Sequence, residues 1–265
     1  VGLTGKGIMP LMVGFGCGVP AIMGARALDS EKDRLTSILI TPFLTCSAKL
    51  PIMALFAAMF FPEHAANLVF SMYIIGIVVA IIMAKVLGIT AFRSQGSTFL
   101  LELPPYRMPD MKTVLLETWD KGKGYLIKAG TIIFAMSVGI WFLSNYNADG
   151  ATDEMSESFL ASIGGGMSHL FALHGFETWE SGAAVVTGIM AKESVVSTLG
   201  ILYGVGDVST EAEDAAETAT QFAGSMGTAF TAASALAFMV FSQLYTPCMT
   251  SLGTIKKETG KWSWM

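Results

Sequence analysis

The sequence predicts an all-α fold, a polytopic bundle of transmembrane helices in which some helices are broken or re-entrant. Hydrophobic residues make up 52% of the 265 residues and charged residues only 14%, whereas an ordinary soluble domain carries about 25% charged residues. The charges are also unevenly placed, because lysines and arginines gather within residues 26–34, 85–128 and 256–261 while long apolar runs carry few. A lipid bilayer is therefore the expected solvent.

Five segments are long and apolar enough to cross a bilayer, which takes about 20 residues of helix. These predicted spans are residues 8–28, 35–61, 67–89, 125–144 and 228–253. Residues 159–203 are too apolar for a loop, yet they contain three consecutive glycines and a Lys-Glu pair. This region needs a separate interpretation.

The distribution of basic residues among the loops gives the orientation of the spans. Residues 61–66 and 145–180 contain no lysine or arginine, whereas residues 85–128 contain seven. If the basic loops are cytoplasmic, the fourth span ends outside and the last span starts outside. Residues 159–203 must then leave and return on the outer side, either by crossing twice or as re-entrant helices whose broken backbone lines a cavity.

Two connecting segments have distinct compositions. Residues 111–123 mix apolar side chains with lysines and predict an interfacial helix on the inner leaflet. Residues 204–227 are acidic, rich in glycine and alanine, and lack basic residues, which predicts a flexible outer loop. Because Val1 is not an initiator methionine and the chain stops at Met265 among apolar residues, we expect residues 1–265 to be one transmembrane domain of a longer protein.

Charge and cysteine content exclude other classes of protein. A net charge of −5 gives no basic surface for nucleic acid, so no nucleic-acid partner is expected. The three cysteines all lie in apolar segments and cannot all pair with one another, which argues against a secreted disulfide framework. Free thiols are expected instead.

The first span contains a motif that predicts a helix break. Residues 14–20 read Gly-Phe-Gly-Cys-Gly-Val-Pro, in which Pro20 lacks a backbone donor and the glycines add flexibility. A break here frees carbonyl groups and the Cys17 thiol toward an interior space. The alternative interpretation is a simple kink with a buried cysteine that packs as a small hydrophobe.

Three further motifs combine a polar or sulfur side chain with a possible break. Residues 41–51 place Cys46 and Lys49 between two prolines, and a proline-kinked structural helix is the alternative interpretation. Residues 245–250 place Pro247 directly before Cys248. Residues 190–194, Met-Ala-Lys-Glu-Ser, put two charges in an apolar region, where they are functional if buried or ordinary if they lie at a helix end in water.

These motifs together predict a pathway for a metal ion. The candidate ligands are Cys17, Cys46, Cys248, Glu193 and Met190. The candidate hinge residues are Gly16, Gly18, Pro20, Pro42, Pro51 and Pro247. A sulfur-rich set suits a borderline ion such as Fe2+ better than Mg2+ or Ca2+, which prefer oxygen ligands. We expect Fe2+ as the transported ion and no permanently bound cofactor.

Two of the cysteine motifs are similar to each other. Cys17 is followed nine residues later by Arg26, and Cys248 is followed nine residues later by Lys257. Both segments are predicted to leave the membrane inward. An internal repeat of the gate is one interpretation, and chance similarity over a short match is the other.

In this order the motifs resemble the membrane part of the ferrous iron transport protein B family, which carries two gate motifs. The matching segments are residues 16–23 with Arg26 and residues 33–35 for the first gate, 42–51 for the segment between the gates, 190–193 for the Ala-Lys-Glu motif, and 245–248 with 257–260 and Trp262 for the second gate. Gly18 departs from the family, in which asparagine is common at that position. The sequence also contains no Gly-x-x-x-x-Gly-Lys-Ser/Thr motif for a nucleotide.

The resemblance implies a multi-pass transporter of Fe2+ in the bacterial inner membrane and no enzyme activity of this chain by itself. It also implies that GTP and Mg2+ bind to a domain outside this chain, in cis or in trans. Further implied partners are membrane lipid, small accessory iron-transport proteins and a homo-oligomer. The alternatives are a nucleoside-type transporter of organic solutes, a membrane thiol oxidoreductase and a non-transporting anchor subunit.

Overall fold

The computed structural model describes residues 5–90, 110–147, 150–152, 155–171, 175, 177–205, 215–222, 224 and 226–261. The predicted all-α fold is confirmed, since the described strands are limited to the pair β1 (Tyr146–Asn147) and β2 (Gly150–Ala151). The α-helices are α1 (Ile8–Gly14), α2 (Gly18–Gly24), α3 (Glu31–Ile40), α4 (Leu50–Phe60), α5 (Ala65–Thr90), α6 (Met111–Asn145), α7 (Phe159–Phe171), α8 (Trp179–Met190), α9 (Ser194–Leu202), α10 (Ala215–Phe222), α11 (Ala232–Leu244) and α12 (Met249–Thr259). The 3-10 helices are η1 (Gly5–Gly7), η2 (Ala25–Ala27), η3 (Thr41–Phe43), η4 (Ser47–Lys49), η5 (Pro62–His64), η6 (Met155–Glu157) and η9 (Met226–Thr228).

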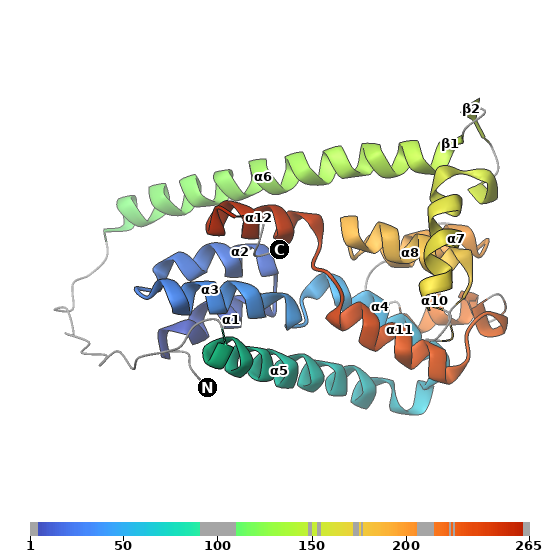
Figure 1. Cartoon of the computed structure of the whole chain (residues 1–265), viewed down its shortest axis with the longest axis horizontal. Coiled ribbons are helices and arrows are strands. Elements are labelled where there is room, and N and C mark those ends of the chain that lie inside the picture. Colours follow the sequence, from blue (N-terminus) through green and yellow to red (C-terminus); the bar gives the residue numbers. More distant parts are fainter. Residues whose placement is uncertain are drawn as a thin grey trace.

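Four helical stretches within the described residues are long and apolar enough to cross a membrane. They are Glu31–Phe60, Pro62–Thr90, Met111–Asn145 and Ala232–Thr259. These stretches run along the long axis of the molecule, with α5 and α6 on opposite edges (Figure 1). Apolar side chains such as Phe70 on α5 and Phe134 on α6 are exposed, as lipid-facing side chains are.

Residues 8–28 form two short helices, α1 and α2, in place of one continuous helix. A Cβ atom built on Gly14 would lie 3.6 Å from the Cβ of Ala21, whereas seven residues of straight helix span about 10 Å. The chain therefore reverses direction at residues 15–17, and α1 packs against α2. Pro20 lies in the first turn of α2, where a missing N–H is tolerated because that turn has no intrahelical acceptor.

Two of the spanning stretches are also interrupted near the middle of their length (Figure 1). Helices α3 and α4 are separated by η3, η4 and the residues between them, and α11 is separated from α12 by residues 245–248. Pro42 and Pro51 lie at the start of η3 and α4. Pro42 follows α3 in the first turn of η3, and Pro51 follows η4 in the first turn of α4; a missing backbone donor is least harmful in the first turn of a helix.

Helix α6 joins the segment expected to be interfacial with the following span. Residues 111–123 and 125–144 form one helix of 35 residues, which is about 52 Å long at 1.5 Å per residue. This exceeds a hydrocarbon core of about 30 Å, so part of α6 extends beyond it. The helix begins at Asp110, whose carboxylate accepts hydrogen bonds from the hydroxyl and the backbone N–H of Thr113, and these bonds hold the pKa of Asp110 below its usual value.

Residues 159–203 contain the short helices α7, α8 and α9. Helices α8 and α9, of 12 and 9 residues, are each shorter than the roughly 20 residues needed for a crossing, and they pack against each other after a break at residues 191–193. Helix α7 packs closely on α8 because Gly164 has no side chain; a Cβ there would lie 2.6 Å from the Trp179 carbonyl oxygen. Part of the predicted loop 204–227 lies outside the described residues, and its described part contains α10 and η9.

Helix α5 approaches the interrupted helices closely at Gly76. A Cβ atom on Gly76 would lie 2.5 Å from Nε2 of Gln243 and 2.8 Å from the carbonyl oxygen of Phe43. Both groups belong to the hydrogen-bonded region between the helix breaks, because Gln243 Nε2 donates to that same Phe43 carbonyl at 2.9 Å. Glycine at this position therefore lets α5 pack directly on the polar centre of the molecule.

We predict that Gly76→Ala lowers the free energy of unfolding by about 1–3 kcal/mol, because the added methyl group must displace the Gln243 amide and the Phe43 carbonyl. Denaturant titration in detergent micelles measures this effect. Gly88→Ala on the same helix is the matched control, since a Cβ there meets nothing within 4 Å. Equal stabilities of the two variants would contradict the proposed close packing at Gly76.

Candidate functional site

A cavity of about 570 Å3 lies where four helix breaks meet. Its wall is formed by the α1–α2 connection, the segment from η3 to the start of α4, the α8–α9 connection, the α11–α12 connection and the face of α6 that carries Tyr125 and Ala129. The sequence separates these segments by up to about 230 residues. The fold therefore brings the four predicted motifs to one place.

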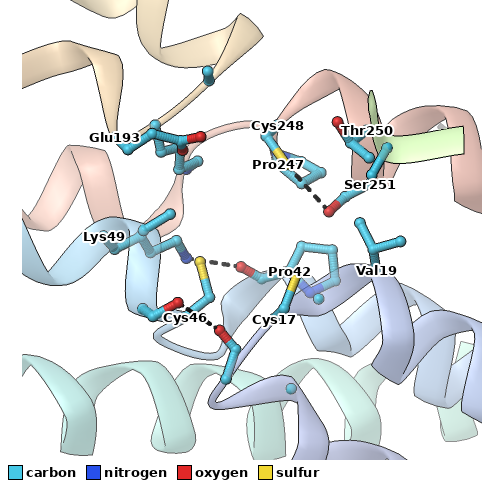
Figure 2. Close-up of a pocket in the computed structure, with 18 of the residues that line it drawn as sticks. Cys17, Val19, Pro42, Cys46, Lys49, Glu193, Pro247, Cys248, Thr250 and Ser251 are labelled. Atoms are coloured by element: carbon cyan, nitrogen blue, oxygen red, sulfur yellow. Dashed lines mark hydrogen bonds between the residues drawn. The ribbon is translucent and has the colours of Figure 1, made fainter. Parts of the chain in front are cut away.

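All five predicted metal ligands line this cavity: Cys17, Cys46, Cys248, Glu193 and Met190. Figure 2 shows the three cysteine side chains facing a common space from three different helix breaks. Of the predicted hinge residues, those that also line the cavity are Gly16, Gly18, Pro42, Pro51 and Pro247, whereas Pro20 is not part of the lining. The cysteines are free thiols and are partly buried.

Each cysteine occupies the same local position, directly before a helix starts. Cys17, Cys46 and Cys248 are the N-cap residues of α2, η4 and α12, and all three have extended backbone conformations. The first N–H groups of a helix have no intrahelical acceptor and carry a partial positive charge. The three sulfur atoms therefore lie beside helix N-termini, an environment that favours a negatively charged ligand.

Glu193 and Lys192 are neighbours in sequence but lie in different environments. Glu193 is exposed at the edge of the cavity, whereas only 2% of Lys192 is exposed. The Lys192 ammonium donates to the Ser242 carbonyl at 3.2 Å and lies 3.9 Å from the centre of the Tyr245 ring. The alternative interpretation, in which both charged side chains lie in water at a helix end, therefore applies to Glu193 and not to Lys192.

Lys49 is also buried and joins two of the helix breaks. Its ammonium donates to the carbonyl oxygens of Pro42, Leu44 and Gln243 at 3.0, 3.1 and 2.8 Å. These three bonds use all three donors of the ammonium group, so its burial leaves no donor unsatisfied. Lys49 thereby connects the end of α11 to the segment between α3 and α4.

Metal ligands in the cavity do not form a closed site in this conformation. Within the part of the chain that the structure describes, no three His, Cys, Asp or Glu side chains lie close enough together to hold one metal ion.

Sequence reasoning missed Gln243 and Tyr125. The Gln243 amide is buried and donates to the Phe43 carbonyl and the Thr45 hydroxyl, both at 2.9 Å. Its signal in the sequence was a polar side chain inside a predicted span, which is unusual enough to indicate a buried partner. Tyr125 gave no such signal, because its place on the cavity wall depends on how α6 packs across the bundle.

Comparison with known proteins gives two matching family models. The model described as nucleoside recognition, named Gate, matches residues 1–60 and 126–262, and the model of the ferrous iron transport protein B C terminus matches residues 69–121. The first of these covers well over half of the chain. No solved structure shows significant similarity to the chain.

Curated relatives match along almost the whole chain. The Fe(2+) transporter FeoB of Staphylococcus aureus is 43% identical over 263 residues, covering 99% of this chain and 38% of the relative. FeoB of Methanocaldococcus jannaschii is 40% identical over 271 residues, with the same two coverages. A Fe(2+) transport protein A/Fe(2+) transporter FeoB fusion protein of Porphyromonas gingivalis is 35% identical over 303 residues, covering all of this chain and 36% of the relative. The chain thus spans less than half the length of these relatives.

We predict that Lys49→Met lowers the free energy of unfolding by about 2–4 kcal/mol, because three buried carbonyl groups lose their donor. Denaturant titration in micelles measures the loss. Lys85→Met is the matched control, since Lys85 is exposed on α5. If both variants were as stable as the unchanged protein, the ammonium group would not be what holds the two breaks together.

Proposed function

Because this chain belongs to the ferrous iron transport protein B family, we propose that it forms the pathway by which Fe2+ crosses the bacterial inner membrane. The observation that carries the proposal is the meeting of three cysteines, from three separate helix breaks, at one cavity midway along the spanning helices (Figure 2). Broken helices that surround a polar cavity are typical of transport sites in membrane proteins.

The chemistry of the cavity supports a borderline divalent ion as cargo. Thiolate sulfur binds Fe2+ well, and each thiol that binds the ion releases its proton to solvent. Cys17 and Cys248 lie at the start of α2 and α12, which pack against each other. A shift between the starts of these two helices would change the distance between the sulfurs of Cys17 and Cys248. The ion would then lose one of its ligands and bind to another ligand of the cavity.

The ends of these two helices are joined by a salt bridge. Arg26 donates to both carboxylate oxygens of Glu258, through Nε at 2.6 Å and through a terminal nitrogen at 2.5 Å. Both bonds join ionised groups, which makes them stronger than hydrogen bonds between neutral groups. In the proposed function this ion pair keeps α2 and α12 together at their C-terminal ends, and the flexible residues beside Cys17 and Cys248 act as hinges that let the starts of the two helices shift.

The proposed driving force lies outside this chain. A nucleotide-binding domain, attached in cis or associated in trans, binds GTP and Mg2+ and biases the gates, so this chain itself is not an enzyme. A small accessory protein is a further proposed partner, since the Porphyromonas gingivalis relative carries the name of a fusion with Fe(2+) transport protein A. Membrane lipid contacts the outer faces of α5 and α6, and a homo-oligomer is the proposed assembly.

A nucleoside-type solute is a second candidate cargo. The model that matches most of the chain is described as nucleoside recognition, and a cavity of about 570 Å3 lies within the usual range of small-molecule sites. The three cysteines of the cavity favour a metal ion as cargo. Aromatic side chains that could stack on a nucleoside base are few, since Tyr125 is the only aromatic residue among those that line the described cavity. A thiol oxidoreductase would need two cysteines within disulfide reach, which non-reducing peptide mapping of oxidised protein detects.

We predict that Cys17→Ser combined with Cys248→Ser lowers Fe2+ uptake at least about tenfold, because serine keeps the shape of the side chain but removes the soft ligand. Anaerobic uptake into proteoliposomes that contain the full-length protein and an iron-quenched dye measures the rate. The matched control is Ser71→Ala, an exposed position on α5 whose hydroxyl bonds only within its own helix. Retained Fe2+ uptake in the double variant, or uptake of a labelled nucleoside by the unchanged protein, would contradict the proposal.

A further inference from the structure

The breaks in the helices free many backbone carbonyl oxygens beside the cavity. The last carbonyls of α11, including those of Ser242 and Gln243, have no intrahelical donor because the helix stops at Leu244. The carbonyl of Pro42, within the three-residue η3, and that of Leu44, between η3 and η4, also lie outside any α-helix. Backbone carbonyl oxygens at broken membrane helices coordinate Na+ in transporters, and hard divalent cations such as Mg2+ and Ca2+ also take oxygen ligands.

In this structure those carbonyls are already occupied by donors from side chains. Lys49 bonds the carbonyls of Pro42, Leu44 and Gln243, and Lys192 bonds that of Ser242. Both ammonium groups therefore lie at the negative end of α11, on carbonyls of consecutive residues. They occupy the position that a free cation would otherwise take.

Two other carbonyls at the breaks have side-chain donors as well. The Phe43 carbonyl accepts from the Gln243 amide at 2.9 Å. The Gly16 carbonyl accepts from the backbone N–H of Ser47 at 3.1 Å and from its hydroxyl at 2.9 Å. These carbonyl oxygens at the breaks are thus used inside the protein, whereas the three cysteine side chains face the cavity, with Cys248 Sγ 3.4 Å from the Ser251 hydroxyl (Figure 2).

The two ammonium groups also set the charge of the cavity wall. Among the described residues, neither Lys49 nor Lys192 makes a salt bridge to a carboxylate, and both line the cavity. Glu193 supplies one negative charge at the exposed edge. A dication held by neutral oxygens would therefore be repelled by the uncompensated positive charge of the lysines. A dication bound by cysteine is different, because the negative charge of the thiolate sulfur offsets part of the charge of the ion.

We propose that Lys192 and Lys49 are specificity-determining residues, tethered cations that occupy the free carbonyl oxygens of the helix breaks and thereby exclude hard cations from the pathway. The inference rests on the proposed function and adds the reason for its selectivity: Mg2+, which takes oxygen ligands, finds these four carbonyl oxygens occupied by ammonium groups, while Fe2+ binds the cysteine sulfurs. Lys192 is the better position to test, because it makes one carbonyl bond where Lys49 makes three.

The test compares Mg2+ and Fe2+ uptake by the full-length protein in the same proteoliposomes, loaded with a Mg2+-sensitive dye or an iron-quenched dye. Lys192→Met frees the Ser242 carbonyl and removes the charge, and we expect the ratio of Mg2+ to Fe2+ uptake to rise about tenfold. Lys192→Arg keeps a cation and donors, so its ratio should stay near that of the unchanged protein. Lys85→Met removes an exposed charge outside the cavity and should leave the ratio unchanged.

The ratio separates selectivity from folding, because loss of folded protein lowers both rates together. If Lys192→Met does not fold, Lys192→Gln takes its place: it retains one donor for the carbonyl, loses the charge, and should raise the ratio by a smaller factor. An unchanged ratio in the neutral variant that folds, with Fe2+ uptake still active, would overturn this inference alone. An unchanged protein that carries no Fe2+ would overturn the proposed function and the inference with it.

Discussion

Inside a bilayer every backbone carbonyl needs a donor from the protein, and this requirement governs the centre of the molecule. Four interrupted segments meet there, and several of their carbonyls accept hydrogen bonds from side chains of the same or another segment. Lys49 is the main example, because its ammonium bonds two carbonyls of its own segment and one at the end of α11. In the opposite direction, the side-chain amide of Gln243 on α11 donates a hydrogen bond to the Phe43 carbonyl. The breaks are therefore linked to one another by hydrogen bonds.

The direction of each helix then separates two kinds of chemistry within one cavity. Helices that start at the breaks place Cys17, Cys46 and Cys248 at their positive ends, whereas the helix that stops there, α11, presents its negative end to Lys49 and Lys192. Sulfur ligands and ammonium groups are thus sorted by helix polarity. An ion in the cavity meets sulfur beside helix N-termini and finds the carbonyls already bonded.

The outer helices supply the frame on which this centre is built. Helices α5 and α6 lie on opposite edges and expose apolar side chains, as expected of lipid-facing surfaces (Figure 1). Their inner faces differ: α5 reaches the polar centre through the bare backbone of Gly76, and α6 reaches the cavity through Tyr125. The spans in contact with lipid were readable from the sequence because hydropathy along a helix is a local property.

The sequence by itself determined the all-α membrane fold, the family, and the motifs in which helices are interrupted, since apolar length, Gly and Pro all act locally. It also identified the cysteines that line the cavity. It did not determine that residues 8–28 turn back on themselves, that α6 runs without a break, or that Lys192 and Glu193 lie in different environments. Only the tertiary structure decided these points, because the partners concerned, such as the Ser242 carbonyl for Lys192, lie about 50 residues away and no local pattern specifies which carbonyl a lysine will meet.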